Sequence, residues 1–193
     1  MLMLIIGLIL FFGLHSVGIV APYWRLRMLL MVGEGGWKGV YSVLSGLGFV
    51  LMIIGFAQAR HGAQLLYAPP VALRYLTFVL MAPVFPLLLA AYLPGRIQTR
   101  ARHPMLAAVI LWATAHLLAI GTVPDVLLFG SFLLWAIIDR IAVKRRQPSP
   151  ARRRLALPYG DVIAVTLGLL LYALFLLKLH TLLIGVSPLV RPL

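Results

Sequence analysis

The segment RHPMLAAVILWATAHLLA, residues 102–119, decides how this chain folds. A basic residue and a proline mark the start of a helix, and the apolar run that follows approaches the ~20 residues that cross a bilayer. The run nevertheless contains an imidazole, His116. Titratable side chains inside a span are costly, and most of them face the bundle interior and serve a function. The segment therefore predicts a membrane span that carries a candidate site residue.

The whole chain shares this apolar character. Of its 193 residues, 63% are hydrophobic and 11% are charged, which is far from the composition of soluble domains. We predict an all-α, polytopic transmembrane bundle surrounded by lipid bilayer, with residues 1–193 forming a single domain. Six helices are expected, at about 2–22, 39–59, 71–93, 104–121, 123–143 and 160–184.

Prolines and glycines refine this prediction. Pro83 and Pro86 should kink the third helix, because each removes a backbone donor. The connection from Gly121 to Pro124 is so short that the fourth and fifth helices should be antiparallel neighbours. No charge precedes Arg25, whereas cleaved signal peptides begin with a positive region. The first helix is therefore expected to be retained.

The basic residues set the expected orientation. Thirteen of the 17 Lys and Arg residues follow odd-numbered helices, and cytoplasmic loops carry such an excess. Both termini are therefore expected on the periplasmic side of a multi-pass protein of the cell inner membrane. Topology and anionic lipid also explain the net charge of +13 and the basic cluster at 140–154, so no nucleic-acid partner is predicted.

Several kinds of site are excluded by composition. The chain has no cysteine and only four acidic residues, which excludes disulfides and thiolate sites and disfavours hard-cation sites. No nucleophile with a base, no glycine-rich phosphate loop and no paired carboxylates occur at a recognisable spacing. The histidines remain as the candidates for chemistry within the membrane.

His15 and His116 both lie inside apolar runs. His15 shares a helical face with Phe11, and His116 shares one with Trp112. Two neutral imidazoles among rings suit a flat, apolar ligand such as haem, whose iron is commonly held by axial histidine. The alternative is that each imidazole hydrogen-bonds a neighbouring helix and stabilises the bundle.

The other three histidines lie near the ends of the spans. His61 and His180 are expected at the outer interface as solvated or headgroup-facing residues. His103, between Arg102 and Pro104, is either a helix-start residue or a contact for a propionate or substrate. It lies thirteen residues from His116, hence ~20 Å along a helix, so the two cannot ligate one iron.

A resemblance extends over nearly the whole chain. It rests on FGLHS at 12–16, GFAQAR at 55–60, APP at 68–70, PGRI at 94–97, RHPM at 102–105, LWATAHLL at 111–118 and FGSFLLWAIIDR at 129–140. In these motifs the chain resembles the NnrU family of bacterial membrane proteins. That resemblance implies an association with denitrification, that is, with nitrite and nitric oxide metabolism.

The NnrU family is similar in turn to zeta-carotene isomerase, a membrane haem b enzyme that converts a cis double bond of a carotene to trans. The resemblance implies that His15 and His116 are the haem ligands and that His103 is a further characteristic histidine. The isomerase also has a cysteine near its second ligand, and this chain has none. Sharing a fold does not fix a function.

Three hypotheses follow. The first is a b-type haem between His15 and His116, walled by Trp112 and Phe11, with His103, Arg102 and other inner arginines at the propionate end. Its role would be redox or haem-linked support of nitrogen-oxide respiration. The second is a haem-dependent isomerase of a carotenoid-like polyene, with an apolar groove near the Pro83/Pro86 kink. The third is a non-catalytic scaffold whose histidines pack helices. The substrate, redox partner and oligomeric state are not indicated.

Overall fold

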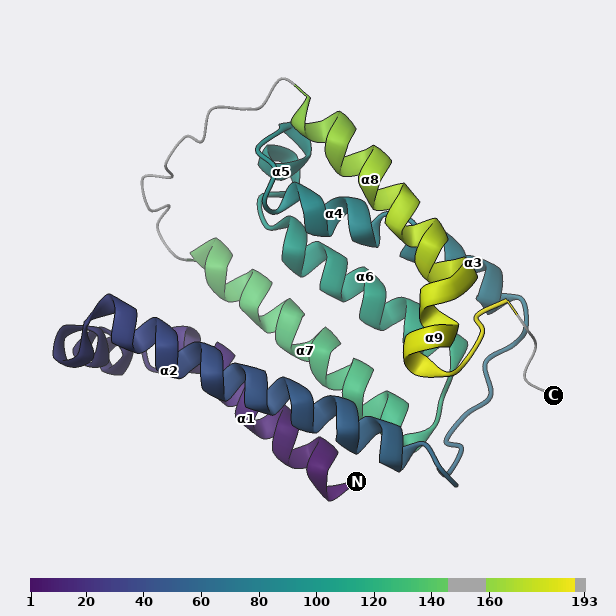
Figure 1. Ribbon diagram of the computed structural model, residues 1–193, viewed down its shortest axis with the longest axis horizontal. Coiled ribbons are helices and arrows are strands. Elements are labelled where there is room, and N and C mark those ends of the chain that lie inside the picture. The colour runs from purple at the N-terminus through teal and green to yellow at the C-terminus, as the bar shows by residue number, and fades with distance from the viewer. Residues whose placement is uncertain (146–158, 190–193) are drawn as a thin grey trace.

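The computed structural model describes residues 1–145 and 159–189, and it is helical, with one isolated bridge between Leu65 and Thr122 (Figure 1). The predicted basic residues between 146 and 154, and Arg191, lie outside the described residues. The helices are α1 (Leu2–Val20), α2 (Pro22–Ala59), α3 (Leu73–Met81), α4 (Val84–Ala90), α5 (Arg96–Ala101), α6 (Pro104–Ala119), α7 (Val123–Arg145), α8 (Gly160–Leu174), the π-helix η1 (Phe175–Leu179) and α9 (His180–Ile184).

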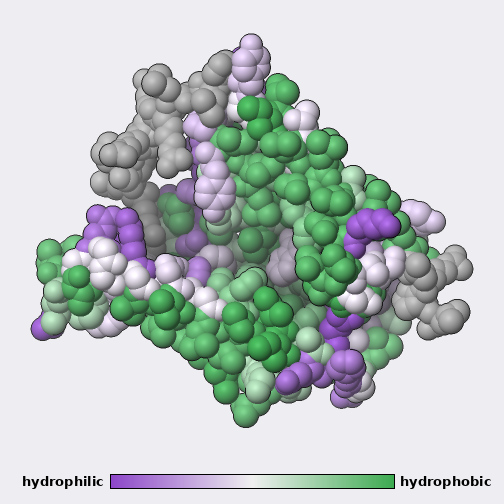
Figure 2. Space-filling view, viewed as in Figure 1, coloured by the Kyte–Doolittle hydropathy of each residue, from purple (hydrophilic) through white to green (hydrophobic). Residues whose placement is uncertain are grey.

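The spans agree with the prediction of a multi-pass membrane protein. Within the described residues, five helical segments are long and apolar enough to cross a membrane, when α3 and α4 are counted together and α8 is counted with η1 and α9. The sixth, α6, is apolar but has 16 residues, so it is ~24 Å long. The apolar side chains that cover much of the visible surface in Figure 2 suit a lipid environment.

The structure corrects the prediction at three places. The expected loop between the first two spans is helical, because α2 begins at Pro22 and bends at Gly33 rather than starting near 39. The expected loop before 104 contains the short helix α5. The last span is interrupted by the π-helix η1. The kink at Pro83 and Pro86 is present, since it separates α3 from α4.

The helices form two groups (Figure 1). The first is the hairpin of α1 and α2, which pack closely on each other. The second contains α6 beside α7, α3 and α4 against α6, and α8 against α4. The short connection predicted to make α6 and α7 neighbours does so. The groups meet where α1 contacts α7, around a core of Leu4, Leu8 and Met52.

We name the two ends of the bundle after the helices found there. Met1 and α9 lie at one end, the α9 end, whereas α5 and the start of α8 lie at the other, the α5 end (Figure 1).

Candidate functional site

His15 lies on α1 among aromatic rings of three helices. Its Nδ1 donates a hydrogen bond of 2.8 Å to the carbonyl of Phe11, one turn earlier. Its ring stacks on that of Phe11 with centroids 4.0 Å apart. Tyr41 of α2 and Trp135 of α7 complete the surroundings, at 5.3 and 5.8 Å. The imidazole is therefore held in one orientation by its own helix and enclosed by the two neighbouring ones.

His116 repeats this arrangement on α6. Its Nδ1 donates a hydrogen bond of 2.8 Å to the carbonyl of Trp112, again one turn earlier. The imidazole stacks on Phe129 of α7 at 4.4 Å and lies 5.3 Å from the ring of Trp112. The two histidines thus share the same local geometry, although they belong to different helix groups.

The hydrogen bonds fix which ring nitrogen of each imidazole carries a proton. A backbone carbonyl can only accept, so the Nδ1 that bonds to it must be protonated. In a neutral imidazole the Nε2 then keeps its lone pair. Holding one ring nitrogen in this way is how proteins orient histidines that ligate metals. In the neutral form, His15 and His116 would therefore each present Nε2 as the ligating atom.

One aromatic cluster joins the two histidines: Phe11, Phe12, Trp112, Phe129, Phe132 and Trp135. Phe132 is its centre, because its ring lies 5.7 Å from Phe11, 4.9 Å from Phe12 and 5.3 Å from Trp112. The difference in depth between the two histidines can be read along α7. His116 contacts Phe129, and His15 contacts Trp135, which lies six residues further on. Six residues correspond to ~9 Å along a helix. The cluster therefore separates two imidazoles that lie at different depths.

One polar atom beside His15 has no hydrogen-bond partner among the described residues. It is the buried indole Nε1 of Trp135, whose ring lies 5.8 Å from that of His15. Buried polar groups without partners are rare, and each calls for an explanation, such as an ordered water or a ligand. The surroundings of His15 are therefore suited to a group that carries a hydrogen-bond acceptor.

His103 and Arg102 lie at the α5 end, at the opposite end of α6 from His116. His103 is the residue before the first turn of α6, where its carbonyl accepts from Ala107 at 3.1 Å. Arg102 is exposed and has φ 58°, a value that non-glycine residues seldom adopt. The structure therefore does not bring this pair together with His116, which lies in the last turn of the same helix.

The remaining histidines occupy the α9 end. The Nδ1 of His180 donates to the carbonyl of Val186 at 2.6 Å, so this residue fixes the chain after α9. His61 lines a cavity of about 390 Å³ formed with Gln58 and Gln64. His180 thus has a structural contact that its sequence position did not indicate.

A loop secures the end of α6 that carries His116. The hydroxyl of Tyr67 donates to the carbonyl of Leu117 at 2.5 Å, and the amides of Leu66 and Tyr67 donate to the carbonyl of Gly121. Burial, and secondly the nearby carboxylate of Asp125, raise the pKa of Tyr67 above its ordinary value. The phenol therefore stays protonated at neutral pH and remains a donor.

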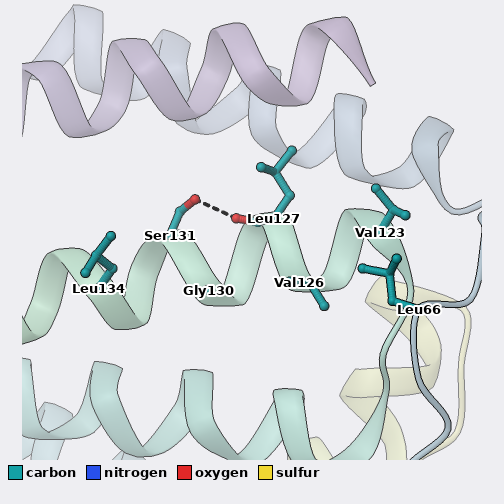
Figure 3. A pocket seen from close by; sticks show the side chains of 7 residues that line it. All are labelled: Leu66, Val123, Val126, Leu127, Gly130, Ser131 and Leu134. Carbon is teal, nitrogen blue, oxygen red and sulfur yellow. Dashed lines mark hydrogen bonds between the residues drawn. The ribbon is translucent and has the colours of Figure 1, made fainter.

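An apolar groove lies along α7 (Figure 3). It has a volume of about 410 Å³ and is lined by Leu66, Val123, Val126, Leu127, Gly130, Ser131 and Leu134. At 100° per residue, this stripe lies on the face of α7 opposite to Phe129 and Phe132. Phe129 is the ring of α7 that contacts His116, so the body of the helix would separate a molecule in this groove from that imidazole.

Helix α8 covers Pro86 at the proline kink. Pro86 is buried, and Gly168 of α8 lies so close that a Cβ there would overlap the proline backbone. α8 therefore fills the space beside the kink.

Comparison with known proteins identifies the family. The sequence matches the NnrU protein family over residues 3–188. The chain belongs to the NnrU family. No curated protein and no solved structure matches it. Both imidazoles and the whole aromatic cluster lie within the matched part of this NnrU protein.

Sequence reasoning missed most of the residues around the imidazoles of this NnrU protein. Phe129, Phe132 and Trp135 follow each other at three-residue spacing, a pattern that could have marked one face of α7. Tyr41 gave no such signal, because its proximity to His15 depends on how α2 packs against α1.

Proposed function

We propose that this NnrU protein binds one b-type haem through the Nε2 atoms of His15 and His116. The protein would lie in the bacterial inner membrane with both termini on the periplasmic side. It would give redox or haem-linked support to nitrogen-oxide metabolism, as the family association with denitrification suggests. The observation that carries the proposal is the matching orientation of the two imidazoles, each with Nδ1 on a backbone carbonyl.

The donor set suits haem better than a bare metal ion. Among residues 1–145 and 159–189, no group of three or more His, Cys, Asp or Glu side chains is placed to hold a metal. A haem brings four nitrogens of its own and needs only two axial ligands from the protein. Two neutral imidazoles on either side of an aromatic cluster meet that smaller requirement.

Haem binding requires a rearrangement of the side chains between the two imidazoles. Phe132 contacts rings from both helix groups, so a macrocycle could enter only after this side chain changed rotamer. The buried Nε1–H of Trp135 could serve as a donor to an oxygen-bearing substituent. The surroundings therefore fit haem in donor chemistry and polarity, with Phe132 as the residue that must move.

A bound haem would supply reversible one-electron chemistry, with a potential set by axial ligands and burial. The chain's own residues would hold and shield it. The carbonyls of Phe11 and Trp112 fix the two imidazoles, and the aromatic cluster excludes water. Arg102 and His103 lie at the α5 end, where they could meet a propionate only if the macrocycle reached that surface.

The test is the absorption spectrum of the detergent-purified protein after haem reconstitution, oxidised and then reduced with dithionite. We expect a Soret band with sharp α and β bands on reduction. The variants His15→Ala and His116→Ala should each lose these bands, because bis-histidine ligation needs both residues.

His61→Ala is the matched control, because this histidine lies in the loop at the α9 end. Its spectrum should equal that of the wild type. Absence of a Soret band in the haem-supplied wild type would refute the proposal, and the scaffold hypothesis would take its place. Retention of the reduced bands in His15→Ala would instead refute the assignment of that ligand.

Isomerisation of a polyene receives less support than haem binding itself. It requires an apolar groove that presents a double bond to the haem. The described groove lies on the face of α7 that is turned away from His116, and α8 packs closely on Pro86 at the proline kink. The chain also lacks the cysteine that the isomerase has near its second ligand.

A further inference from the structure

The first eleven residues of α2 form a separate helix outside the membrane-spanning hairpin. Gly33 has φ 74° and ψ 167°, a conformation available essentially only to glycine, and it breaks α2 into residues 22–32 and residues 34–59. Figure 1 shows this first part at the far end of the hairpin, away from α6 and α8. We call it the 22–32 helix.

The packing register of the hairpin gives the depth of this helix. A Cβ at Gly55 would overlap Leu4, and one at Gly48 would lie 3.0 Å from the amide nitrogen of Phe11. Extending this antiparallel register places Val20, the last residue of α1, level with residue 39. The chain between 34 and 38 therefore rises ~8 Å beyond the end of α1. That distance is close to the thickness of one headgroup layer.

The 22–32 helix exposes an apolar stripe at this level. Tyr23, Leu26 and Leu30 follow the i, i+3, i+7 spacing of one helical face, and they are 88%, 55% and 79% exposed. Trp24 faces the spanning part of α2, where its ring lies 5.9 Å from that of Trp37. The helix is thus attached on one side and uncovered on the other.

The charged residues of the 22–32 helix indicate what kind of surface covers the apolar stripe. Arg25 and Arg27 are both exposed and are the charged residues between 22 and 32. Apolar residues, interfacial aromatics and arginines on one short helix are the composition of helices that lie in the plane of a membrane and bind anionic lipid. A soluble protein partner would not require the helix to be level with the headgroups.

We propose that the 22–32 helix lies in the plane of the membrane and binds the headgroup layer of an anionic lipid leaflet. Tyr23, Leu26 and Leu30 enter the boundary between headgroups and acyl chains, while Arg25 and Arg27 contact lipid phosphates. Gly33 lets the chain turn from this plane into the bilayer. The helix anchors the hairpin that carries His15, and this role does not depend on haem binding.

The absence of native cysteine permits a direct test of depth. Single variants Leu26→Cys and Leu30→Cys of the full chain would carry a nitroxide label, in vesicles of phosphatidylcholine mixed equally with phosphatidylglycerol. Accessibility to oxygen and to a water-soluble nickel chelate would then be measured by electron paramagnetic resonance. His61→Cys, in the loop at the α9 end, is the matched control.

For each label, the ratio of its accessibility to oxygen over its accessibility to the nickel chelate reports depth in the membrane. We expect this ratio to be several-fold higher for both labels on the helix than for the label at position 61. Equal accessibility at all three positions would overturn the proposal, because the stripe would then face water. Shielding of the helix labels from both reagents would also overturn it, because protein would then cover the stripe, either a second copy or another partner.

A charge variant tests the anionic part separately. Replacing phosphatidylcholine vesicles by the phosphatidylglycerol mixture should raise the apparent Tm of the wild type. The double variant Arg25→Gln/Arg27→Gln should lose most of that increment, since each basic residue near an anionic surface strengthens binding about fivefold. Lys178→Gln, near the α9 end, should keep it. An unchanged increment in the double variant would overturn the role of the two arginines.

Discussion

Two helix pairs of this protein pack through different kinds of residue: the hairpin of α1 and α2, and the pair of α6 and α7. α1 and α2 approach through glycines, so that backbone meets backbone at Gly7, Gly48 and Gly55. α6 and α7 meet through rings, with Trp112 4.9 Å from Phe129, and a loop fixes their connection. Small residues are how membrane helices gain close contact without a hydrophobic driving force between them.

This difference explains the unequal surroundings of the two histidines. The close approach of α1 and α2 brings Tyr41 beside His15, and α7 adds Trp135 from the other side. His116 has a ring from α7 on one face and Trp112 of its own helix nearby. Glycine packing thus places side chains of three helices around His15, whereas ring packing surrounds His116 chiefly with two.

The largest expected effect comes from adding a methyl group to the glycine contact. Gly55→Ala would place a Cβ onto the backbone atoms of Leu4. Backbone atoms cannot move aside by a change of rotamer. We expect a loss of about 3 kcal/mol in the free energy of unfolding, as for overpacked cores. Unfolding in mixed micelles, followed by circular dichroism, would measure it.

The matched control is Gly46→Ala, on the same helix, where an added Cβ meets nothing within 4 Å. It should be neutral or stabilising by about 0.5 kcal/mol, because alanine is the better helix former. Equal stability of the two variants would show that α1 and α2 do not depend on backbone contact at Gly55.

The next effect concerns the ring that joins the two helix groups. Phe132→Ala removes contacts with Phe11, Phe12 and Trp112 at once. Because Phe132 is only partly buried, we expect about 2 kcal/mol of destabilisation, below the range for fully buried phenylalanine. The same unfolding measurement applies.

Leu134→Ala serves as its control, since Leu134 lies on the same helix and is 62% exposed. It should change the unfolding free energy by much less. If both substitutions cost the same, Phe132 would be no more than one of many lipid-facing residues, and the two helix groups would be joined elsewhere.

The smallest effect concerns the loop that secures α6. Tyr67→Phe removes the hydrogen bond to the carbonyl of Leu117 and leaves the ring in place. A loss of about 1 kcal/mol is expected, as for a single hydrogen bond. Amide hydrogen exchange at the end of α6 should rise in this variant.

Tyr75→Phe is the control for this substitution, because Tyr75 is 72% exposed. Its exchange pattern should match that of the wild type. Unchanged exchange at the end of α6 in Tyr67→Phe would mean that the backbone bonds to Gly121 suffice to hold this helix end.

Much of the fold could be predicted from the sequence. Hydropathy located the apolar helices, and the missing donors of Pro83 and Pro86 marked the break between α3 and α4. The spans predicted at about 2–22 and 39–59 leave the residues between them as a connecting loop. The structure shows a helix there, since a single glycine, Gly33, suffices for the change of direction.

Part of the candidate site could likewise be predicted from the sequence, and part could not. His15 and His116 stood out in the sequence because an imidazole within an apolar run is costly wherever its helix packs. The positions of Phe132 and Trp135 relative to them could not be derived, because they depend on how α7 packs against both α1 and α6. Their haem-binding role remains a proposal that the spectra will decide.

The sequence by itself determined that this chain is a multi-pass helical membrane protein with two imidazoles inside its spans. It could do so because the transfer of each residue into lipid depends on local composition. Only the tertiary structure decided that both imidazoles donate Nδ1 to a carbonyl, that one aromatic cluster separates them and that α2 begins outside the hairpin. The aromatic cluster depends on contacts between residues far apart in the chain, such as Phe11 and Phe132, whereas the two hydrogen bonds and the bend at Gly33 depend on the backbone and rotamer conformations that the folded chain adopts locally.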